Sequence, residues 1–306
     1  MSYKCTFSVF TATFNRAYCL HRPYEALKAQ TYKDFEWVII DDGSTDNTKE
    51  LVETWKKEAD FSIIYVVQPK GGKHFAFNTA HDYMQGKYFI SIDSDDSAKP
   101  IWLEKVKAYW DKFTAEDYKK VGGIMYGAEN QHGVPIGDKF PDDGIDVDYI
   151  AYSLKNKVVG DKGYTYQMEV FKKYPFPTEV KNVYVPEGYF FHELGEHWKI
   201  RIYNDILIVP YIEDRADHTT NELTKPKNYA GNWYGHLSFL KFSNRLFWII
   251  PYTHLANATY YSKLSFLLNY SIKKQYKAIG NFWGRFFWLL TLPLGFILAK
   301  KTSNIK

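Results

Sequence analysis

Acidic side chains are missing from the last part of this 306-residue sequence, because no Asp or Glu follows Glu222. Residues 225–306 contain 12 Lys and Arg residues, whereas the residues before them contain 27 Lys and Arg against 35 Asp and Glu. The chain therefore joins an acidic body to a basic tail. A tail of this composition is typical of binding to an anionic surface.

Cysteine is also scarce, with only Cys5 and Cys19 in the whole sequence. Their number and positions give no support to a disulfide framework or a cysteine metal site. The first residues lack the charged and apolar segments of a signal peptide. From these features we expect a reduced, cytoplasmic protein.

Glycine is absent from residues 11–16, which follow the first apolar run. A nucleotidylyltransferase or a dinucleotide oxidoreductase with a doubly wound sheet would place a glycine-rich phosphate loop at this point. The sequence therefore argues against both classes.

Strand and helix patterns alternate over the first hundred residues. Short apolar runs rich in β-branched and aromatic residues predict buried parallel strands at residues 5–10, 35–40, 61–67 and 88–92. Candidate helices lie between them at residues 18–29, 46–57 and 74–85. This alternation predicts an α/β fold with a doubly wound, mostly parallel sheet.

A polar cluster follows each of these predicted strands. The clusters are residues 11–16, 41–44, 69–73 and 93–96. In a doubly wound sheet, ligands bind beyond the carboxyl ends of the strands. We therefore expect the four clusters to converge on one binding site.

The cluster after the fourth strand contains Asp93-Ser94-Asp95. Hard divalent cations prefer carboxylate oxygens, and a bound cation neutralises the charge on a departing diphosphate. An isolated Asp-x-Asp is more often a polar turn than a metal site. Its place among three other strand ends favours a cation site.

The other clusters offer groups suited to a nucleotide. Asp41 and Asp42 can accept hydrogen bonds from a base and a ribose, although a turn with a helix cap explains the same residues. Arg16 and Lys73 can bind phosphate oxygens, with paired glycines before Lys73 allowing close approach. A solvated surface lysine is the alternative for Lys73.

Four segments resemble, in order and spacing, the family 2 glycosyltransferases with the Rossmann-like GT-A fold. They are Thr11-Ala12-Thr13-Phe14-Asn15-Arg16, Asp41-Asp42-Gly43-Ser44-Thr45-Asp46, Gly72-Lys73-His74 with Asn78, and Asp93-Ser94-Asp95-Asp96. The resemblance covers roughly residues 5–100. It implies an inverting transfer of a sugar from a nucleotide diphosphate donor, often UDP-linked, with Mg²⁺ or Mn²⁺ as the cofactor.

The resemblance also implies roles for individual residues. Asp95 is expected to bind the metal, and Asp93 is expected to be shared between the metal and the ribose. The expected donor-binding residues are Thr11, Thr13, Asn15, Arg16, Asp41, Asp42, Lys73, Asn78, Asp93 and Ser94.

An inverting transfer needs a general base on the acceptor side. In this family the base is a carboxylate at the start of a helix in the second half, and Glu187 is the matching residue here. His192, Glu193 and Glu196 follow closely and remain alternatives, and a plain first-turn acid is a further explanation of Glu187. His218 is a candidate additional metal ligand, with an exposed loop histidine as the alternative.

The expected organisation is a catalytic domain at residues 1–224 and a helical tail at residues 225–306. Within the domain, residues 1–120 form the nucleotide-sugar half and residues 121–224 the acceptor half. The tail has an apolar run of 14 residues at 286–299, shorter than the roughly 20 that span a bilayer. Flanking basic residues and many rings predict a monotopic or re-entrant membrane anchor.

A C-terminal helix packed on the domain is the alternative for this tail. Nucleic acid is not an expected partner, because no recognised binding module is present. The predicted protein is a peripheral enzyme on the inner face of the cell membrane. It moves a sugar to a glycan acceptor, lipid-linked by inference, in surface polysaccharide synthesis. The alternatives are an inactive sugar- or lipid-binding protein of the same fold and a sugar nucleotidylyltransferase.

Overall fold

The computed structural model describes residues 3–213 and 225–303. Their contacts group the chain into two compact units. The first, which we call the sheet unit, comprises Met1–Asp148, Asn156–Pro175 and Trp198–Glu213. The second, the helical unit, comprises Tyr149–Lys155, Phe176–His197 and Asp214–Lys306.

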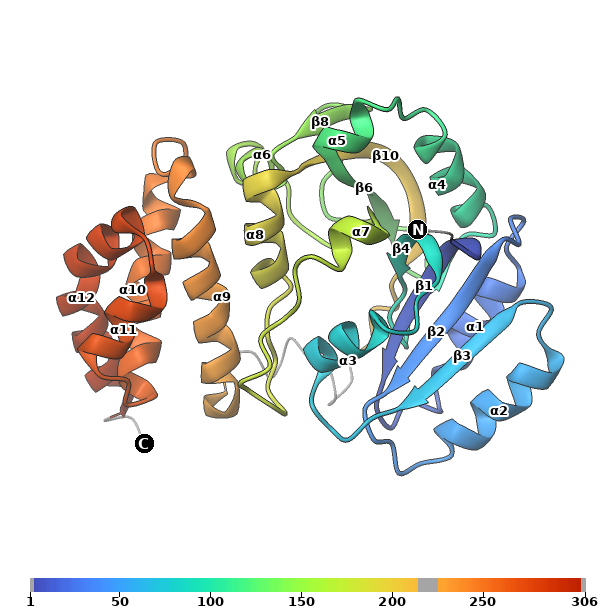
Figure 1. Cartoon of the computed structure of the whole chain (residues 1–306), viewed down its shortest axis with the longest axis horizontal. Coiled ribbons are helices and arrows are strands. Elements are labelled where there is room, and N and C mark those ends of the chain that lie inside the picture. Colours follow the sequence, from blue (N-terminus) through green and yellow to red (C-terminus); the bar gives the residue numbers. More distant parts are fainter. Residues whose placement is uncertain (1–2, 214–224, 304–306) are drawn as a thin grey trace. The chain divides into compact units, whose positions relative to one another are not determined.

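The sheet unit is built on a mixed β-sheet with the strand order β3-β2-β1-β4-β9-β6-β10-β5 (Figure 1). Two short strands, β7 and β8, pair with β6 and β10. The strands are β1 (Cys5–Thr13), β2 (Phe35–Asp41), β3 (Ser62–Val67), β4 (Gly86–Ser91), β5 (Ser97–Ala98), β6 (Val121–Glu129), β7 (Pro135–Ile136), β8 (Ile145–Val147), β9 (Gly163–Gln167) and β10 (Lys199–Val209).

The first four strands are parallel, which confirms the predicted doubly wound arrangement. From β1 the chain builds β2 and β3 on one side, and β4 then pairs with β1 on the other side. The order therefore reverses at β1 and β4, and this is the point where such sheets bind ligands. The rest of the sheet is mixed, because β9 runs antiparallel to both β4 and β6.

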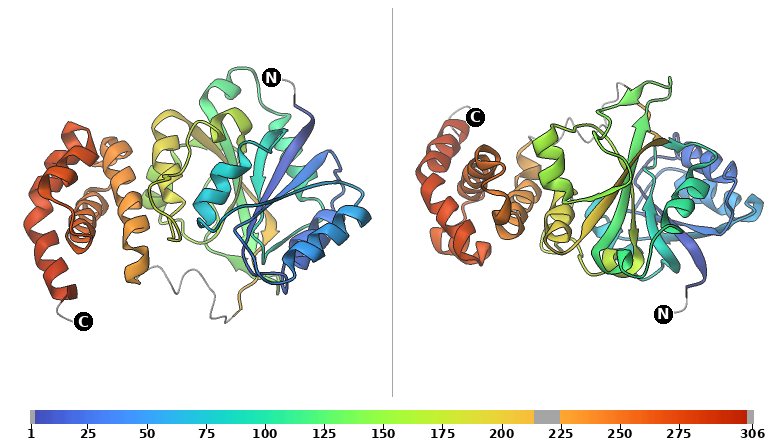
Figure 2. Two further views of the ribbon diagram at one scale, coloured as in Figure 1. Left: turned by 60° about the horizontal axis from the view of Figure 1, so that its bottom comes forward. Right: turned by 90° about the horizontal axis from the view of Figure 1, so that it is seen from above.

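Both faces of the sheet are covered by helices, and Figure 2 shows them on either side of the strands. Helices α1 (His21–Lys28), α2 (Thr48–Glu58) and α4 (Trp102–Trp110) share one core cluster with Phe7, Val9 and Trp37. Helices α3 (Lys73–Ala80) and α7 (Met168–Phe171) supply rings to the other face, where Phe10 packs on Phe77 and Phe89 stacks on Phe171. Alternate side chains of β1 and β4 thus enter different cores, so both strands are buried on both faces. A short helix, α5 (Asp117–Lys120), precedes β6.

One long strand replaces two short predicted ones. The sequence predicts strands at 199–203 and 206–209, whereas β10 runs through both and changes its register against β6 between Ile202 and Ile206. The intervening Tyr203, Asn204 and Asp205 break the apolar pattern at this irregularity.

The helical unit consists of helices and their connections (Figure 1). Its core combines rings and aliphatic side chains of α9, α10, α11 and α12, including Trp233, Leu240, Tyr261 and Trp288. The elements are α6 (Tyr149–Asn156), α8 (Gly188–His197), η2 (Pro226–Asn228), α9 (Tyr229–Phe242), η3 (Asn244–Leu246), α10 (Pro251–Leu267), α11 (Ile272–Ile279) and α12 (Phe282–Ser303).

Helix α8 belongs to the helical unit, although the predicted boundary at residue 224 places it in the catalytic domain. The grouping follows from its packing: α8 lies against α9, and its His192 donates to or accepts from Ser238 of α9 at 2.7 Å. Contacts this distant in sequence are not visible in the local pattern of residues 176–197.

Candidate functional site

The ends of β2 and β3 are joined by one buried carboxylate, that of Asp42. Its Oδ1 accepts hydrogen bonds from the Gly71 amide (2.8 Å) and the Gln68 side chain (2.7 Å), and its Oδ2 accepts one from the Gly72 amide (2.8 Å). Gly72 has φ of +102°, which favours glycine there. Asp42 therefore fixes the glycine loop that leads into α3.

Asp41 is buried next to it and holds its own turn. Its Oδ1 accepts from the Ser44 amide at 2.7 Å, and its Oδ2 accepts from the Tyr65 hydroxyl at 2.5 Å. Burial and the negative Asp41 raise the pKa of Tyr65, so this hydroxyl stays a donor. Both aspartates thus bind donors of the chain itself, and their contact with a nucleotide base stays a prediction.

Thr11, one of the predicted donor contacts, has a side chain that is bonded inside the core. Its side chain is 0% exposed. Its hydroxyl donates to the Ile92 carbonyl at 2.8 Å and accepts from the Trp37 indole at 2.9 Å. Both of its hydrogen-bonding roles are filled inside the core between β1, β2 and β4, so the group is not available to a ligand.

Thr13 and Asn15, further along the same segment, are placed differently. The buried Thr13 hydroxyl finds no hydrogen-bond partner among the described residues, so it remains a candidate donor contact. Asn15 accepts from the Thr45 amide (2.7 Å) and its own amide donates to the Ser44 hydroxyl (2.8 Å). Asn15 therefore ties the loop after β1 to the loop after β2, with a left-handed backbone that asparagine tolerates (φ +51°).

Two ion pairs join the ends of β1 and α3 to the turn after β4. The Arg16 guanidinium lies 2.8 Å from Asp95 Oδ2 and also donates to the Ser94 hydroxyl at 3.3 Å. The Lys73 ammonium, at the start of α3, lies 2.9 Å from Asp93 Oδ1. These contacts confirm that polar clusters 93–96, 11–16 and 69–73 converge at one edge of the sheet. Asn78 lies half-buried in the following turn of α3.

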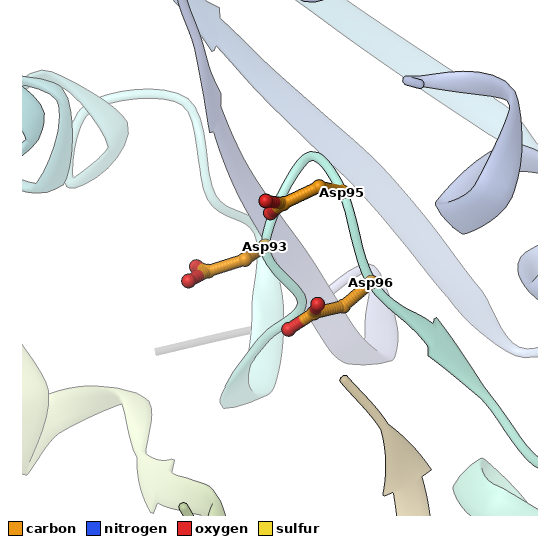
Figure 3. Close-up of side chains that lie close together, drawn as sticks. All are labelled: Asp93, Asp95 and Asp96. Carbon is orange, nitrogen blue, oxygen red and sulfur yellow. The ribbon is translucent and has the colours of Figure 1, made fainter. Parts of the chain in front are cut away.

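Three carboxylates gather on that turn, from Asp93, Asp95 and Asp96. One oxygen from each lies within 4.8 Å of the others. Figure 3 shows the three side chains directed toward the same side of the turn. Asp96, to which the sequence analysis assigns no role, also accepts from the Tyr211 amide at 3.2 Å. In the sequence, the position of Asp96 directly after Asp95 is the feature that could have indicated its place in the cluster.

The charges of this cluster oppose one another. Burial and the negative Asp93 and Asp95 raise the pKa of Asp96 to about 8. Burial acts in the same direction on Asp93, but the nearby Lys73 and Arg16 outweigh it and hold the pKa of that carboxyl below its usual range. A third negative charge is therefore unfavourable in this cluster, and a divalent cation would stabilise it.

This donor set fits the implied Mg²⁺ or Mn²⁺. All three side chains offer hard carboxylate oxygens, close enough together to surround one ion or its bound waters. Arg16 and Lys73 border the same cluster and suit the phosphates that accompany such an ion.

Glu187, the predicted base, belongs to the helical unit and directly precedes α8. Its carbonyl accepts hydrogen bonds from the Phe190 and Phe191 amides, so Glu187 starts the helix as predicted. Among the alternatives, Glu196 is paired with Arg245 at 2.8 Å. His192 is bonded to Ser238.

Glu193 is the remaining alternative, and burial raises its pKa despite the nearby Lys241 and His197. His218, the candidate additional metal ligand, lies outside the described residues.

Residues 8–122 match the family model described as glycosyl transferase family 2. This range contains all four strand-end clusters. The catalytic residue predicted in the second half of the chain lies outside it.

Curated bacterial glycosyltransferases match part of the chain. The teichuronic acid biosynthesis glycosyltransferase TuaG of Bacillus subtilis is 28% identical over 159 residues, which is 52% of this chain and 61% of TuaG. The Campylobacter jejuni GalNAc(5)-diNAcBac-PP-undecaprenol beta-1,3-glucosyltransferase is 32% identical over 94 residues, or 29% of each chain. The chain spans less than two thirds of the length of these curated relatives.

Solved structures share the fold over nearly the whole chain. S. aureus TarS 1-349 in complex with UDP-GlcNAc has a TM-score of 0.62 at 16% identity, covering 96% of this chain and 81% of that one. The mannosyltransferase PcManGT from Pyrobaculum calidifontis, in complex with GDP-Man and Mn²⁺, has a TM-score of 0.55 at 16% identity, covering 98% and 87%. The central sheet is that of GT-A structures, as predicted from the sequence.

Proposed function

We propose that this chain, which carries a family 2 glycosyl transferase region on a GT-A fold, transfers a sugar from a nucleotide diphosphate to a hydroxyl acceptor. One observation carries the proposal. At the reversal of strand order between β1 and β4, three aspartates face the same side as two cationic side chains, Arg16 and Lys73. Carboxylates for a metal ion and cations for phosphates are what a nucleotide diphosphate requires.

Donor binding would exchange the partners of the two cations. Arg16 and Lys73 would turn from Asp95 and Asp93 to the diphosphate oxygens, leaving these carboxylates to Mg²⁺ or Mn²⁺. The metal ion, when bound, supplies a positive charge that stabilises the departing nucleoside diphosphate. The Thr13 hydroxyl and the loop fixed by Asp41, Asp42 and Asn15 would border the nucleoside.

The acceptor hydroxyl must lose its proton as it attacks the anomeric carbon. We assign this proton to the Glu187 carboxylate, in an inverting single displacement that forms one glycosidic bond and breaks the bond to the diphosphate. Glu187 lies at the amino end of α8, the position that the sequence resemblance implies for the base. Glu193 is the alternative, because its raised pKa makes it the stronger base.

The donor and acceptor are inferred from chemistry and from similar proteins. A UDP-sugar is proposed because TarS, with the same fold, was crystallised with UDP-GlcNAc. A glycan acceptor in surface polysaccharide synthesis is proposed because TuaG is named for teichuronic acid biosynthesis. A lipid-linked acceptor at the inner face of the membrane suits the basic tail, and the Campylobacter jejuni relative is named for an undecaprenol-linked substrate.

Thermal unfolding in the presence of UDP and Mn²⁺ tests the proposed site. Addition of both should raise the melting temperature above that with either alone, and Asp95→Ala should abolish the part of the shift that depends on Mn²⁺. Asp60→Ala is the matched control, because Asp60 is an exposed aspartate that precedes β3 and pairs with Lys33, away from the aspartate cluster. A metal-dependent shift that survives Asp95→Ala would place the metal elsewhere.

A further inference from the structure

Helix α12 has two apolar faces, of which only one is packed. The packed face contains Gly284, Phe287, Trp288 and Gly295 and lies along α10 and α11. A Cβ on Gly295 would come within 2.4 Å of the Ser262 side chain, so the α12 and α10 backbones approach closely there. Glycine at such a point permits close helix packing.

This packing extends along the length of the helix. Near the start of α12, Phe287 packs on His254 with ring centroids 4.6 Å apart, and further along Phe296 packs on Phe266 at 5.1 Å. Between them, the Trp288 indole donates to the buried Gln275 side chain of α11 at 3.1 Å. Helix α12 is therefore an integral part of the helical unit.

The opposite face of α12 is apolar and exposed. Phe282 is 70% exposed and Leu289 is 63% exposed. Arg285, the charged side chain between Phe282 and Ile297, is half-buried over the Tyr276 ring of α11. The other large exposed members are Trp283, Phe286, Leu290, Leu294, Phe296 and Ile297. We call these eight residues the apolar face of α12. A continuous exposed surface of this kind marks an interaction site.

Two further exposed rings lie close to the start of this face. Trp248 and Tyr252 are each 88% exposed. Trp248 follows Phe247, whose ring stacks on Phe287 of α12 at 4.4 Å. Trp and Tyr are the side chains that membrane interfaces favour.

Cations surround the other end of the helix. A cavity of about 480 Å³ is lined by Ser271, Lys273, Lys274 and Lys277 of the α11 region. A second cavity of about 630 Å³ also reaches Ser271, and there the rings of Phe266 and Phe296 meet Lys300. Apolar walls beside ammonium groups match the chemistry of an anionic lipid, with its acyl chains and its phosphate.

We propose that the apolar face of α12 lies in the plane of an anionic phospholipid leaflet, with the lysines of α11 and Lys300 binding the lipid phosphates and α12 still packed on α10. The inference rests on the proposed function, since it gives the location of a lipid-linked acceptor. The charge of the tail favours an anionic lipid over a second copy of the chain. Residues 225–306 contain no acidic residue, so two copies that met through this surface would place lysines against lysines.

A membrane-spanning orientation conflicts with the packing. Helix α12 is the one helix in residues 3–213 and 225–303 that is long and apolar enough to cross a membrane by length and composition. If it crossed while packed on α10, the charged Lys263 beside Gly295 would enter the hydrocarbon. If it left α10, the close packing of Gly295 on Ser262 and of Phe296 on Phe266 would be lost. The in-plane orientation keeps the helical unit intact.

Co-sedimentation of the full chain with vesicles tests the lipid surface. We expect binding to vesicles of phosphatidylcholine mixed with phosphatidylserine to exceed binding to phosphatidylcholine alone by on the order of tenfold, and to weaken with salt. The double variant Leu289→Glu with Leu290→Glu should lose this binding. Val134→Glu, which alters an exposed apolar side chain of the sheet unit, should keep this binding.

Labelling with a membrane-impermeant maleimide tests the orientation. Single cysteines at Gly280→Cys, just before α12, or Ser303→Cys, at its end, with Cys5 and Cys19 replaced by alanine, mark the two ends of α12 outside its apolar face. In-plane binding predicts that both are labelled on intact vesicles. Protection of one end until detergent is added would overturn the orientation in favour of spanning.

Other results would overturn the lipid surface itself. These are equal binding to neutral vesicles, unchanged binding of the double variant, or a stable dimer in solution that the double variant abolishes. The double variant should still show the thermal shift with UDP and Mn²⁺. If the wild-type chain binds vesicles but shows no thermal shift with UDP and Mn²⁺, the proposed transferase function is refuted and the proposed lipid surface is not.

Discussion

At the scale of single residues, Arg16 and Lys73 lie where they compete with a metal ion for Asp95 and Asp93. A bound diphosphate would attract both cations, so Mn²⁺ and UDP should bind cooperatively. We expect UDP to strengthen Mn²⁺ binding by about tenfold, the size of a typical coupling between two sites. Titration of Mn²⁺ with and without UDP, followed by the electron paramagnetic resonance of the free ion, measures this factor.

The variant Lys73→Met separates the effect of Lys73 on Mn²⁺ binding from its effect on UDP binding. Without the ammonium, Mn²⁺ alone should bind more tightly to Asp93, whereas UDP should bind about tenfold or more weakly because a charge-assisted hydrogen bond is lost. Lys105→Met is the control, since Lys105 is 3.9 Å from Asp205 and outside the aspartate cluster. Equal affinity of Mn²⁺ with and without UDP would exclude the competition.

A pair of threonines distinguishes structural from binding hydroxyls. Thr11→Val leaves the buried Trp37 indole without its acceptor and should destabilise the fold by about 1–3 kcal/mol, with UDP affinity unchanged. Thr13→Val removes a hydroxyl that has no partner among the described residues, so stability should hardly change while UDP affinity falls. Urea unfolding and UDP titration of both variants test the assignment, and a reversed pattern would refute it.

At the scale of elements, the start of α8 carries the proposed base. Glu187→Gln should keep UDP affinity and lower the transfer rate by about 10²–10⁴-fold, the usual contribution of a general base. Glu193→Gln is the informative comparison, because Glu193 is on the same helix and burial raises its pKa. Rates of sugar transfer for the two variants identify the base. Full activity in Glu187→Gln together with loss of activity in Glu193→Gln would identify Glu193 as the base.

The helical unit should also be sensitive to acid. His254 is fully buried, and burial lowers its pKa to about 4. The unfolded chain takes up a proton at an ordinary pKa of about 6.5 while the folded chain does not, so stability is complete above that pH and falls as the pH drops toward 4. At pH 5 the loss is about 2 kcal/mol for this group.

Urea unfolding followed by far-ultraviolet circular dichroism at neutral and mildly acidic pH measures the loss. His254→Phe should flatten the pH dependence by that amount, although it also removes the hydrogen bond with Asn244 at both pH values. His192 should contribute in the same direction, since burial and the nearby His236 lower its pKa to about 3. An unchanged slope in His254→Phe would show that this histidine is protonated in the folded unit.

Elements that depend on local pattern could be predicted from the sequence, and elements that depend on distant partners could not. The strands before Asp42 and Asp93 are apolar runs ending in polar clusters, so both the strands and the convergence of their ends follow from the pattern. The place of β9 between β4 and β6 is set by pairing with residues about 40 to 80 positions away, such as Tyr166 with Phe89 and Gly123. The burial of the Thr11 side chain depends on the distant Trp37 and Ile92, so the local pattern does not indicate it.

At the scale of the whole molecule, the charge division along the chain corresponds only in part to the structural division. The basic tail lies in the helical unit, as the composition suggests, but α8 and its glutamates join it through side-chain packing on α9. The composition of the sequence does not predict such packing. The predicted boundary at residue 224 follows the division of charge, and the two compact units also exchange residues 149–155 and 176–197, which precede it.

The metal-dependent sugar transfer proposed here requires Asp95 and a nucleotide sugar in the same reaction. Release of UDP from a panel of UDP-sugars with Mn²⁺, compared between the wild-type chain and Asp95→Ala, tests this requirement. We predict release from at least one UDP-sugar, with loss to background on chelation of the metal or in Asp95→Ala, and retention in Asp60→Ala. Release from at least one UDP-sugar that Asp95→Ala leaves unchanged, or no release from any of them, would contradict the proposal.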